Sequence, residues 1–309
     1  MHISVLLEES INSLNIKEDG TYVDCTLGYA GHSSEILKRI KRGSLFAFDQ
    51  DQEAINYSTK KLSSVGSNFT IIKSNFSYLK ERLAEKNIEK VDGILFDLGV
   101  SSPQLDEKER GFSYHEDARL DMRMDRDKEF SAYELVNTYS EKDLARIFFQ
   151  FGEEKYSNSI ARNIVKERES KPIETTLQLV EVIKHSVPEK YSREKHPARK
   201  VFQAIRIEVN HELDILEQSL KDAASILEIG GRLSVITFHS LEDRIVKNLF
   251  KELTDIDSKV KGLPNIPEAY LPEYRLITTK AISPSQEELE MNNRSRSSKL
   301  RVIERIREK

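Results

Sequence analysis

Short apolar runs alternate with amphipathic stretches along the first hundred residues of the chain. Residues 21–25 and 44–48 are apolar runs bounded by polar turns, which predicts two buried strands, and the helical spacing between them ends at Gly43. The same alternation predicts four further elements: a helix over 52–62, a strand over 69–73, a helix near 77–85 and a strand over 91–97. The near-continuous apolar run of the last strand is typical of a parallel strand covered on both faces.

The middle of the chain lacks strand patterning. Its apolar positions follow helical spacing, with helices expected over 132–139, 141–149, 156–168 and 176–185. Ser140 with Asp143 resembles a capping box at the start of one of them. We therefore predict an inserted, all-helical domain over 105–198, within a Rossmann-like domain formed by 1–104 and 199–309.

Beyond the insertion the pattern returns to α/β. Apolar residues over 201–227 recur at spacings of three, four or seven, which predicts one long helix that ends at Gly230 and Gly231. The remaining predicted elements are a strand over 233–238, a helix capped by Ser240, a loop over 254–272, and two strands over 274–278 and 299–303 that would pair as a hairpin. The expected fold is a doubly wound α/β sheet of about seven strands with a helical insertion after the fourth.

A turn with glycines at positions 28 and 31 joins the first predicted strand to its helix. Gly28 and Gly31 let the backbone approach a ligand at the carboxyl end of the strand. Asp24 ends this strand, and Asp49 ends the next one, where a carboxylate can accept hydrogen bonds from two ribose hydroxyls. The alternative is that these glycines only bend the chain.

The chemistry of this turn favours S-adenosylmethionine over NAD, FAD or ATP. Dinucleotide enzymes favour G-x-G-x-x-G, which is absent here, and the turn contains no Lys or Arg. Asp24 ahead of the glycines would repel a phosphate, but it can accept a hydrogen bond from the ammonium of a methionine moiety. A nicotinamide oxidoreductase is therefore a distant alternative.

A second polar segment follows the fourth predicted strand, which ends at Asp97. The segment contains Ser101, Ser102 and Gln104, and it leaves the sheet at the edge where ligands bind in α/β proteins. To methylate an exocyclic amine, an enzyme must orient the nitrogen and accept its hydrogen bonds, which carboxylate and hydroxyl oxygens on a rigid turn can do. The alternative is that Asp97 caps a turn that steers the chain into the insertion.

Composition bounds the function. The chain has 48 Lys and Arg against 52 Asp and Glu, so its net charge of −4 does not indicate an overall attraction to nucleic acid. Locally, residues 292–309 are rich in Lys and Arg, which suits phosphate contacts by Arg294 and Arg296. The segment around Arg199 and Lys200 is also basic, although such a run is usually a solvated face. The single cysteine excludes an internal disulfide. With no signal peptide or membrane helix in the sequence, we expect a soluble cytoplasmic protein without a membrane partner.

Several longer motifs are spread along the chain. They are His2-x3-Leu6-Leu7-x-Glu9, Asp24-x-Thr26-x-Gly28-x2-Gly31-His32-Ser33, Asp92-Gly-Ile-Leu-x-Asp-Leu-Gly-Val-Ser-Ser-Pro-Gln-Leu-Asp106, Arg110-Gly-Phe-Ser113, Leu120-Asp-Met-Arg-Met-Asp125, His196-Pro-Ala198 with Phe202-Gln-Ala-x-Arg206, Gly230-Gly-Arg-Leu-Ser234, Phe238-His-Ser-Leu-Glu-Asp-Arg244 and Arg294-Ser-Arg-Ser-Ser298. With these motifs the sequence resembles, nearly end to end, the RsmH (MraW) family of bacterial small-subunit ribosomal RNA methyltransferases.

The resemblance implies a class I, Rossmann-like S-adenosylmethionine-dependent methyltransferase with an inserted helical domain for substrate recognition. It implies methylation of N4 of a cytosine in the decoding centre, in the P-site region, of 16S rRNA within the small ribosomal subunit. The residues that it assigns to the cofactor are Ala30, Gly31 and His32 in the turn, Asp49 at the ribose, Phe76 near the adenine, and Asp97 with Gln104.

One departure from the family, one difference from DNA amino-methyltransferases and several alternatives accompany this assignment. The family usually has glycine where this chain has Ala30, so a backbone contact there requires a φ that is not positive. Pro103 is not followed by the aromatic residue that stacks on the base in DNA amino-methyltransferases, so stacking would come from Phe112 or Tyr114. His32 could contact the cofactor or cap its helix. The protein could also methylate another RNA or a protein, or serve as a non-catalytic assembly factor of the small subunit.

Overall fold

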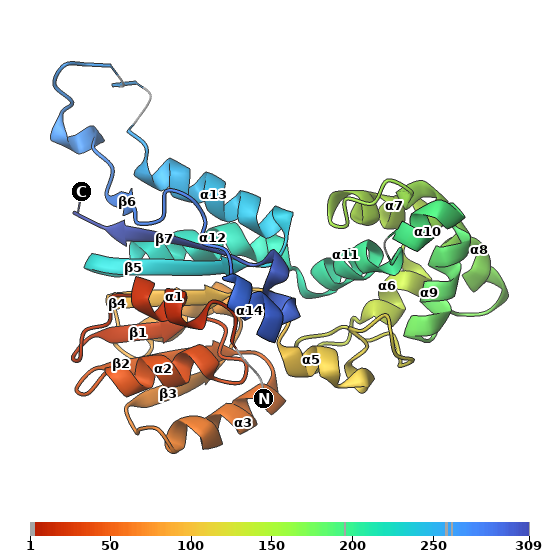
Figure 1. The fold of residues 1–309 in the computed structure, drawn as a ribbon, viewed down its shortest axis with the longest axis horizontal. Coiled ribbons are helices and arrows are strands. Elements are labelled where there is room, and N and C mark those ends of the chain that lie inside the picture. The colour runs from red at the N-terminus through yellow and green to blue at the C-terminus, as the bar shows by residue number, and fades with distance from the viewer. Residues whose placement is uncertain (1–3, 195, 257–258, 261, 309) are drawn as a thin grey trace. The chain divides into compact units, whose positions relative to one another are not determined.

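The computed structural model describes residues 4–194, 196–256, 259–260 and 262–308 (Figure 1). The chain forms two compact units. Met1–Gly99 and Asp214–Lys309 make the sheet unit, and Val100–Leu213 makes the helical unit. The predicted domain ranges were 1–104 with 199–309 for the sheet and 105–198 for the insertion. The structure instead places all of α5, Ser102–Asp106, and α11, Ala198–Asn210, in the helical unit. Val100, Leu105 and six residues of α11 pack into the core of that unit.

The sheet unit is built on seven strands in the order β3-β2-β1-β4-β5-β7-β6. The first five strands in this order are parallel, whereas β7 is antiparallel to both β5 and β6. The strand order reverses between β1 and β4, which is where α/β sheets bind ligands. The strands are β1 Thr21–Asp24, β2 Ser44–Asp49, β3 Phe69–Lys73, β4 Val91–Asp97, β5 Leu227–Thr237, β6 Tyr274–Leu276 and β7 Lys299–Arg305.

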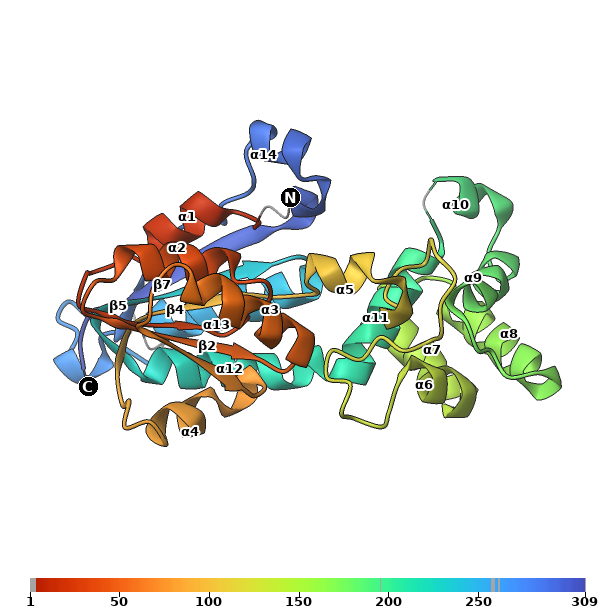
Figure 2. The same cartoon turned by 90° about the horizontal axis from the view of Figure 1, so that it is seen from below.

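Helices cover both faces of this sheet (Figures 1 and 2). Successive strand residues point to opposite faces, so Phe96 belongs to one core cluster and Leu95 to another. The Phe96 cluster includes residues of α4, α12 and α13, and the Leu95 cluster includes residues of α1, α2 and α3. The helices of the sheet unit are α1 Leu7–Ser13, α2 Gly31–Arg39, α3 Gln52–Ser63, α4 Leu79–Ala84, α12 Glu212–Ser225, α13 Ser240–Thr254 and α14 Gln286–Met291.

The helical unit has a core of its own, made by apolar faces of α6, α7, α8, α9 and α11. Side chains cap the starts of α6, α7 and α9, and the cap predicted at Ser140 is confirmed. Ser140 accepts a hydrogen bond from the backbone of Asp143, and Ser131 with Glu134 forms a full capping box. The helices are α5 Ser102–Asp106, α6 Ala132–Thr138, α7 Glu141–Gln150, α8 Ser157–Ser170, α9 Thr176–His185, α10 Glu189–Glu194 and α11 Ala198–Asn210.

The single helix predicted over 201–227 is wrong. The chain forms α11 and α12 instead, separated at His211, whose φ of 54° is left-handed and cannot continue a right-handed helix. Gly230 and Gly231 do not end a helix either, because β5 already begins at Leu227. Gly230 has a φ of 82° and lies where the pairing of β5 with β4 shifts register, so it serves an irregularity in the strand.

Two further expectations need correction. The N-cap of α13 is His239, not Ser240, which is the first helical residue. Strands β6 and β7 pair as predicted, but their connection contains α14 and the short helix η4, Asn293–Ser297. Three more 3₁₀ helices are η1 Phe76–Tyr78, η2 Lys108–Arg110 and η3 Glu268–Tyr270. Within the described part of the chain, no helix combines the length and apolarity that crossing a membrane requires.

Candidate active site at the carboxyl ends of the strands

The turn between β1 and α2 is held in a left-handed conformation at two positions. Gly28 has a φ of 47° and Ala30 a φ of 54°. Ala30 is fully buried, and the N–H of the same residue donates to the Leu27 carbonyl at 2.8 Å. A left-handed alanine costs about 1–2 kcal/mol relative to its ordinary conformation. Ala30 therefore keeps a positive φ with its methyl packed in the core. The condition set from sequence for a backbone contact there, a φ that is not positive, is not met.

Gly31 is required by close packing rather than by its φ. A Cβ at this position would lie 1.7 Å from Oγ of Ser4, so the segment ahead of α1 approaches the first residue of α2 closely. This contact brings the carbonyl of Val5 to His32, whose Nε2 lies 3.1 Å from the Val5 oxygen. The turn and the amino-terminal segment thus form one packed structure above the end of β1.

Asp24 and Asp49 fix this turn through their carboxylates. Asp24 is 1% exposed and accepts hydrogen bonds from Thr26 N–H at 3.0 Å and from Ser33 Oγ at 2.6 Å. Asp49 accepts from Gly28 N–H at 2.8 Å and from Asp51 N–H at 2.9 Å. The pKa of Asp49 is raised to about 6, first by burial and then by the charges of Asp51 and Asp24, although both hydrogen bonds lower it.

Asp97 ends β4 beside the turn. The Asp97 N–H donates to Thr26 Oγ1 at 2.7 Å, and the carboxylate Oδ2 lies 3.5 Å from Nδ1 of His32. Oδ1 is buried and has no hydrogen-bond partner among the described residues. Burial raises the pKa of Asp97 well above its usual range, and the charges of Asp24 and Glu242 add to the shift. A buried carboxylate oxygen without a donor is costly, which is typical of a group that meets a ligand.

Phe76 begins η1, the short helix that follows β3 at the same edge of the sheet. The Phe76 ring packs edge-to-face on Phe96, with centroids 5.3 Å apart and planes at 77°. Phe76 is only partly buried. Phe76 follows the end of β3, which pairs with the end of β2 at Asp49, so an aromatic ring on this edge of the sheet suits the base of a nucleoside whose ribose binds Asp49.

Ser101, Ser102 and Gln104 belong to the helical unit. The Ser101 N–H donates to Gln104 Oε1 at 3.1 Å, and the Gln104 N–H donates to Ser101 Oγ at 3.4 Å, so these two residues brace the start of α5. The backbone of Ser102 begins α5, but its side chain lies outside the described part of the structure. The assignment of these three residues to catalysis and cofactor binding stays a prediction.

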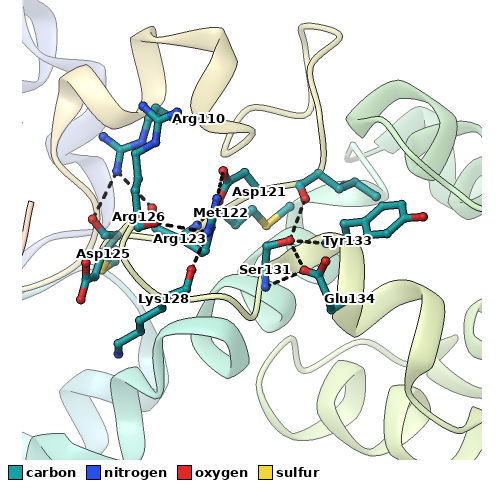
Figure 3. Close-up of polar contacts among 12 residues, drawn as sticks. Arg110, Asp121, Met122, Arg123, Asp125, Arg126, Lys128, Ser131, Tyr133 and Glu134 are labelled. Carbon is teal, nitrogen blue, oxygen red and sulfur yellow. Dashed lines mark hydrogen bonds and ion pairs between the residues drawn. The ribbon is translucent and has the colours of Figure 1, made fainter.

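The polar loop of the helical unit is tied together internally (Figure 3). Arg110 is 3% exposed and donates to the carbonyls of Arg123 and Met124 at 3.0 and 3.3 Å. Arg123 binds the Asp121 carboxylate through Nε at 2.7 Å and Nη2 at 2.9 Å. This charge-assisted pair lowers the pKa of Asp121, although burial alone would raise it. These contacts tie residues 110 and 121–124 into one loop.

Most of the basic carboxyl-terminal segment is engaged in the sheet. Arg301 and Lys299 on β7 bind the Asp243 carboxylate at 2.8 and 3.1 Å, and Arg305 is buried against the Leu227 carbonyl. The prediction for this segment concerns Arg294 and Arg296, which these bonds do not involve. Lys309 lies outside the described residues.

Arg294 and Arg296 in η4 are exposed. They stand just ahead of Lys299, which pairs with Thr237 at the carboxyl end of β5. In the helical unit, Arg199 is exposed on α11, whereas Lys200 donates to the Glu153 carbonyl at 2.6 Å. Of the four residues predicted to bind RNA, the three arginines are therefore exposed.

Sequence reasoning missed two contributors to this site. Glu242 is 2% exposed and accepts from the Phe238 N–H at 2.8 Å, and its charge raises the pKa of Asp97. Val5 supplies the carbonyl that faces His32. Periodicity could not find either residue, because each contacts the site from a segment distant in sequence.

The donor set suits a cofactor that combines a nucleoside with positive charge. Asp49 offers carboxylate oxygens for a ribose, and Asp24 with Asp97 adds two acids at the point where the strand order reverses. A parallel α/β sheet with one antiparallel strand, β7, inserted beside β5, and with these acids at its ligand edge, defines a class I methyltransferase domain.

Comparison with known proteins places the chain within this class. A model of the MraW methylase family matches residues 1–306. Ribosomal RNA small subunit methyltransferase H of Exiguobacterium sibiricum is 56% identical over 308 residues, which is 99% of each chain. The protein belongs to the MraW methylase family. It is therefore a methyltransferase, and its methyl donor is S-adenosylmethionine.

Two solved structures align along nearly the whole chain at low identity. A candidate rRNA-methylase from Clostridium thermocellum is 15% identical, with a TM-score of 0.47 and full coverage of both chains. A candidate methyltransferase from Streptococcus mutans, solved in complex with SAH, is 14% identical, with a TM-score of 0.42 over 98% of this chain and 99% of that one. The family assignment rests on the sequence comparisons.

Proposed function

We propose that this methyltransferase modifies the exocyclic N4 of a cytosine in the decoding centre, near the P site, of 16S rRNA. Two observations support the acceptor. The relative from Exiguobacterium sibiricum, 56% identical, is a ribosomal RNA small subunit methyltransferase. The site also offers what an aromatic amine needs, a carboxylate oxygen of Asp97 that is buried and has no donor among the described residues.

An exocyclic amine is a poor nucleophile because its lone pair is delocalised into the ring. An oxygen that accepts a hydrogen bond from the amine holds the nitrogen in line with the methyl group and favours release of the lone pair. S-adenosylmethionine supplies a methyl group on sulfonium, so the electron pair of the broken carbon–sulfur bond stays on sulfur. In this proposal Asp97 accepts the amine hydrogen bond, and Ser101 or Ser102 assists.

The cofactor assignments follow the contacts at the strand ends. The carboxylate of Asp49 would accept from the ribose hydroxyls, and Phe76 would lie against the adenine. The backbone of Gly28 and of residues 30–32 lines the turn, with the acid of Asp24 behind it. Gln104 is also proposed to contact the cofactor.

The RNA would reach the site over basic residues at its edge. Arg294 and Arg296 are exposed in η4, next to the strand end where Asp97 and Thr237 lie on neighbouring strands. Guanidinium groups there suit phosphates, which hold RNA without specifying its sequence. Arg199 and Lys200 would extend the contact on the helical unit, which we infer to recognise the substrate. The partner would be the small ribosomal subunit in the cytoplasm.

Methyl transfer to small ribosomal subunits that lack the modification tests this proposal. Labelled S-adenosylmethionine, the purified protein and such subunits should yield N4-methylated cytidine on nucleoside mass spectrometry. Free 16S rRNA tested in parallel tells whether the assembled subunit is required. Label on another nucleoside or on a protein would replace the acceptor, and cofactor binding without transfer to any acceptor would indicate an assembly factor.

A further inference from the structure

The imidazole of His32 lies between a backbone carbonyl and the carboxylate of Asp97. Nε2 is 3.1 Å from the Val5 carbonyl oxygen, and Nδ1 is 3.5 Å from Asp97 Oδ2. The His32 side chain is only 5% exposed. Both ring nitrogens therefore face oxygen atoms within a packed environment.

The Val5 carbonyl fixes which nitrogen of His32 carries hydrogen. A carbonyl oxygen can only accept a hydrogen bond, so the nitrogen that faces it, Nε2, must donate. In a neutral imidazole Nδ1 then presents a lone pair, and this lone pair faces a carboxylate oxygen of Asp97. The separation of 3.5 Å is too long for a strong hydrogen bond, but an unprotonated pair at this distance is repulsive. One added proton converts the repulsion into attraction.

The surroundings of the pair favour that proton. Asp24 at the end of β1 and Glu242 in the first turn of α13 raise the pKa of Asp97, after the larger effect of burial. Asp49 at the end of β2 lies close enough to Asp24 for that charge to raise its own pKa. On the side of Val5, Glu288 of α14 accepts from the Leu6 N–H at 2.9 Å. These neighbours are acids, which stabilise positive charge or a bound proton.

We propose that His32 is a positioning residue for Asp97, and that the two side chains hold one proton between Nδ1 and Oδ2. The shared proton fixes the carboxylate, with Oδ2 toward the imidazole. Oδ1, the oxygen without a donor among the described residues, is then the acceptor for the substrate amine. The role in methyl transfer rests on the proposed function, whereas the shared proton is a property of the free protein.

The pair of His32 and Asp97 can also take up the proton that methyl transfer releases. The lone pair of the amine forms the new nitrogen–carbon bond as the carbon–sulfur bond breaks, which leaves a protonated, methylated amine. This amine gives one proton to Oδ1 of Asp97. The pair then holds two protons, one on Oδ1 and one at Nδ1, and it returns to the resting state by losing one to water. No oxidant, metal or further reactant is needed.

Nuclear magnetic resonance of the imidazole groups tests the shared proton without any RNA. In the free protein, the His32 signals, identified by their loss in His32→Gln, should show protonation at both nitrogens at pH 7. Their midpoint should lie about one pH unit or more above the ordinary histidine value of ~6.5. In Asp97→Asn the midpoint should fall by at least about one unit. A neutral imidazole protonated at Nε2 from pH 6 to 8, with no response to Asp97→Asn, would overturn the proposal.

Two substitutions separate the two contacts of His32. In His32→Gln an amide nitrogen can still reach the Val5 carbonyl but not Asp97, and kcat should fall about 10- to 100-fold with KM for the cofactor within about threefold. In His32→Asn an amide nitrogen takes the place of Nδ1 and can still donate to Asp97, but it does not titrate. This variant should recover most of kcat and should lack the decline that wild type shows as rising pH removes the shared proton.

A matched control and the outcomes complete the test. His185→Gln makes the same chemical change on the exposed histidine of α9 and should leave kcat unchanged. Wild-type kcat in His32→Gln would refute the positioning role. If the resonance data show the shared proton but no ribosomal RNA is methylated, the proposed RNA acceptor is refuted, whereas the proton shared by His32 and Asp97 is supported. If RNA is methylated and His32 is neutral, the pair alone fails.

Discussion

Raising the pH from 5 to 8 should strengthen S-adenosylmethionine binding about tenfold, through ionisation of Asp49. Burial raises the pKa of this carboxyl to about 6, so at pH 5 the free protein holds it mostly protonated. The ionised form accepts hydrogen bonds from ribose hydroxyls more strongly than the neutral acid. Binding therefore favours loss of the proton, and affinity rises as the pH passes the pKa of the free protein.

The magnitude follows from the two pKa values. If ribose binding returns the pKa of Asp49 to the ordinary value of ~3.9, protonation of the free protein weakens binding by a factor of about one plus ten raised to the power of the free pKa minus the pH. This factor is roughly eleven at pH 5, two at pH 6 and one at pH 8. Close to one proton should be released on binding at pH 5 and almost none at pH 8.

Isothermal titration calorimetry in buffers of different ionisation enthalpy measures affinity and proton release together. Asp49→Asn keeps one oxygen acceptor but loses the charge and one acceptor site, so binding at pH 8 should weaken about 10- to 100-fold and lose its pH dependence. Asp51→Asn removes a charge that raises the pKa of Asp49, and it keeps a residue type suited to the N-cap of α3, so the midpoint should fall. A wild-type affinity that is flat from pH 5 to 8 would refute the role of Asp49.

Two further perturbations test the basic residues. The double variant Arg294→Ala/Arg296→Ala should weaken RNA binding about tenfold at moderate salt and flatten its salt dependence, with cofactor affinity unchanged. Arg42→Ala/Lys86→Ala removes the same charge at exposed positions preceding β2 and β4, on the opposite edge of the sheet, and should leave RNA binding intact. Equal RNA affinities for the two double variants would exclude a specific role for η4. Asp243→Asn should lower the free energy of unfolding by about 2–4 kcal/mol at pH 7, because it leaves two basic partners on β7 without their carboxylate. Burial would raise the pKa of Asp243, but hydrogen bonds from those partners outweigh it and lower the pKa. The stabilisation is therefore present above the ordinary pKa and lost as the pH falls through the folded one, so denaturation should show the difference shrinking below about pH 4.

The sheet could be predicted from sequence because buried parallel strands leave a strong local signal. The apolar runs over 44–48, 69–73 and 91–97 became β2, β3 and β4 almost residue for residue. The acids that end the strands then followed, since parallel strands bring their carboxyl ends to one edge. The class of fold and the position of the ligand edge were therefore accessible without a structure.

The predictions that were wrong concern elements decided by a single residue or by contacts with residues distant in sequence. His211 interrupts a helical pattern that continues in register on both sides, and nothing in periodicity marks its left-handed φ. Gly230 favours a helix end in general, yet here the chain already pairs with β4. His239 replaces Ser240 as the cap because Glu242 satisfies the backbone N–H of His239, a reciprocal arrangement seen only in three dimensions.

The site shows the same limit. Asp24, Asp49 and Asp97 lie at the predicted edge. The bond from Gly28 N–H to Asp49 and the bond from Asp97 N–H to Thr26 join segments distant in sequence, which no local pattern reveals. The basic carboxyl-terminal segment suggested a phosphate surface, whereas a carboxylate 58 positions earlier, Asp243, binds Arg301. Net charge along a sequence does not tell which charges the fold pairs.

The most direct test of the account is single-turnover methyl transfer by wild type and Asp97→Asn, each saturated with S-adenosylmethionine, to small ribosomal subunits lacking the modification. The amide keeps the size of the side chain but loses the charge that accepts the amine proton. We predict that, with both proteins saturated by cofactor, the rate of N4-methylcytidine formation falls at least about 100-fold in the variant. A variant that transfers the methyl group at the wild-type rate would contradict the assignment of Asp97 as the group that receives the substrate amine.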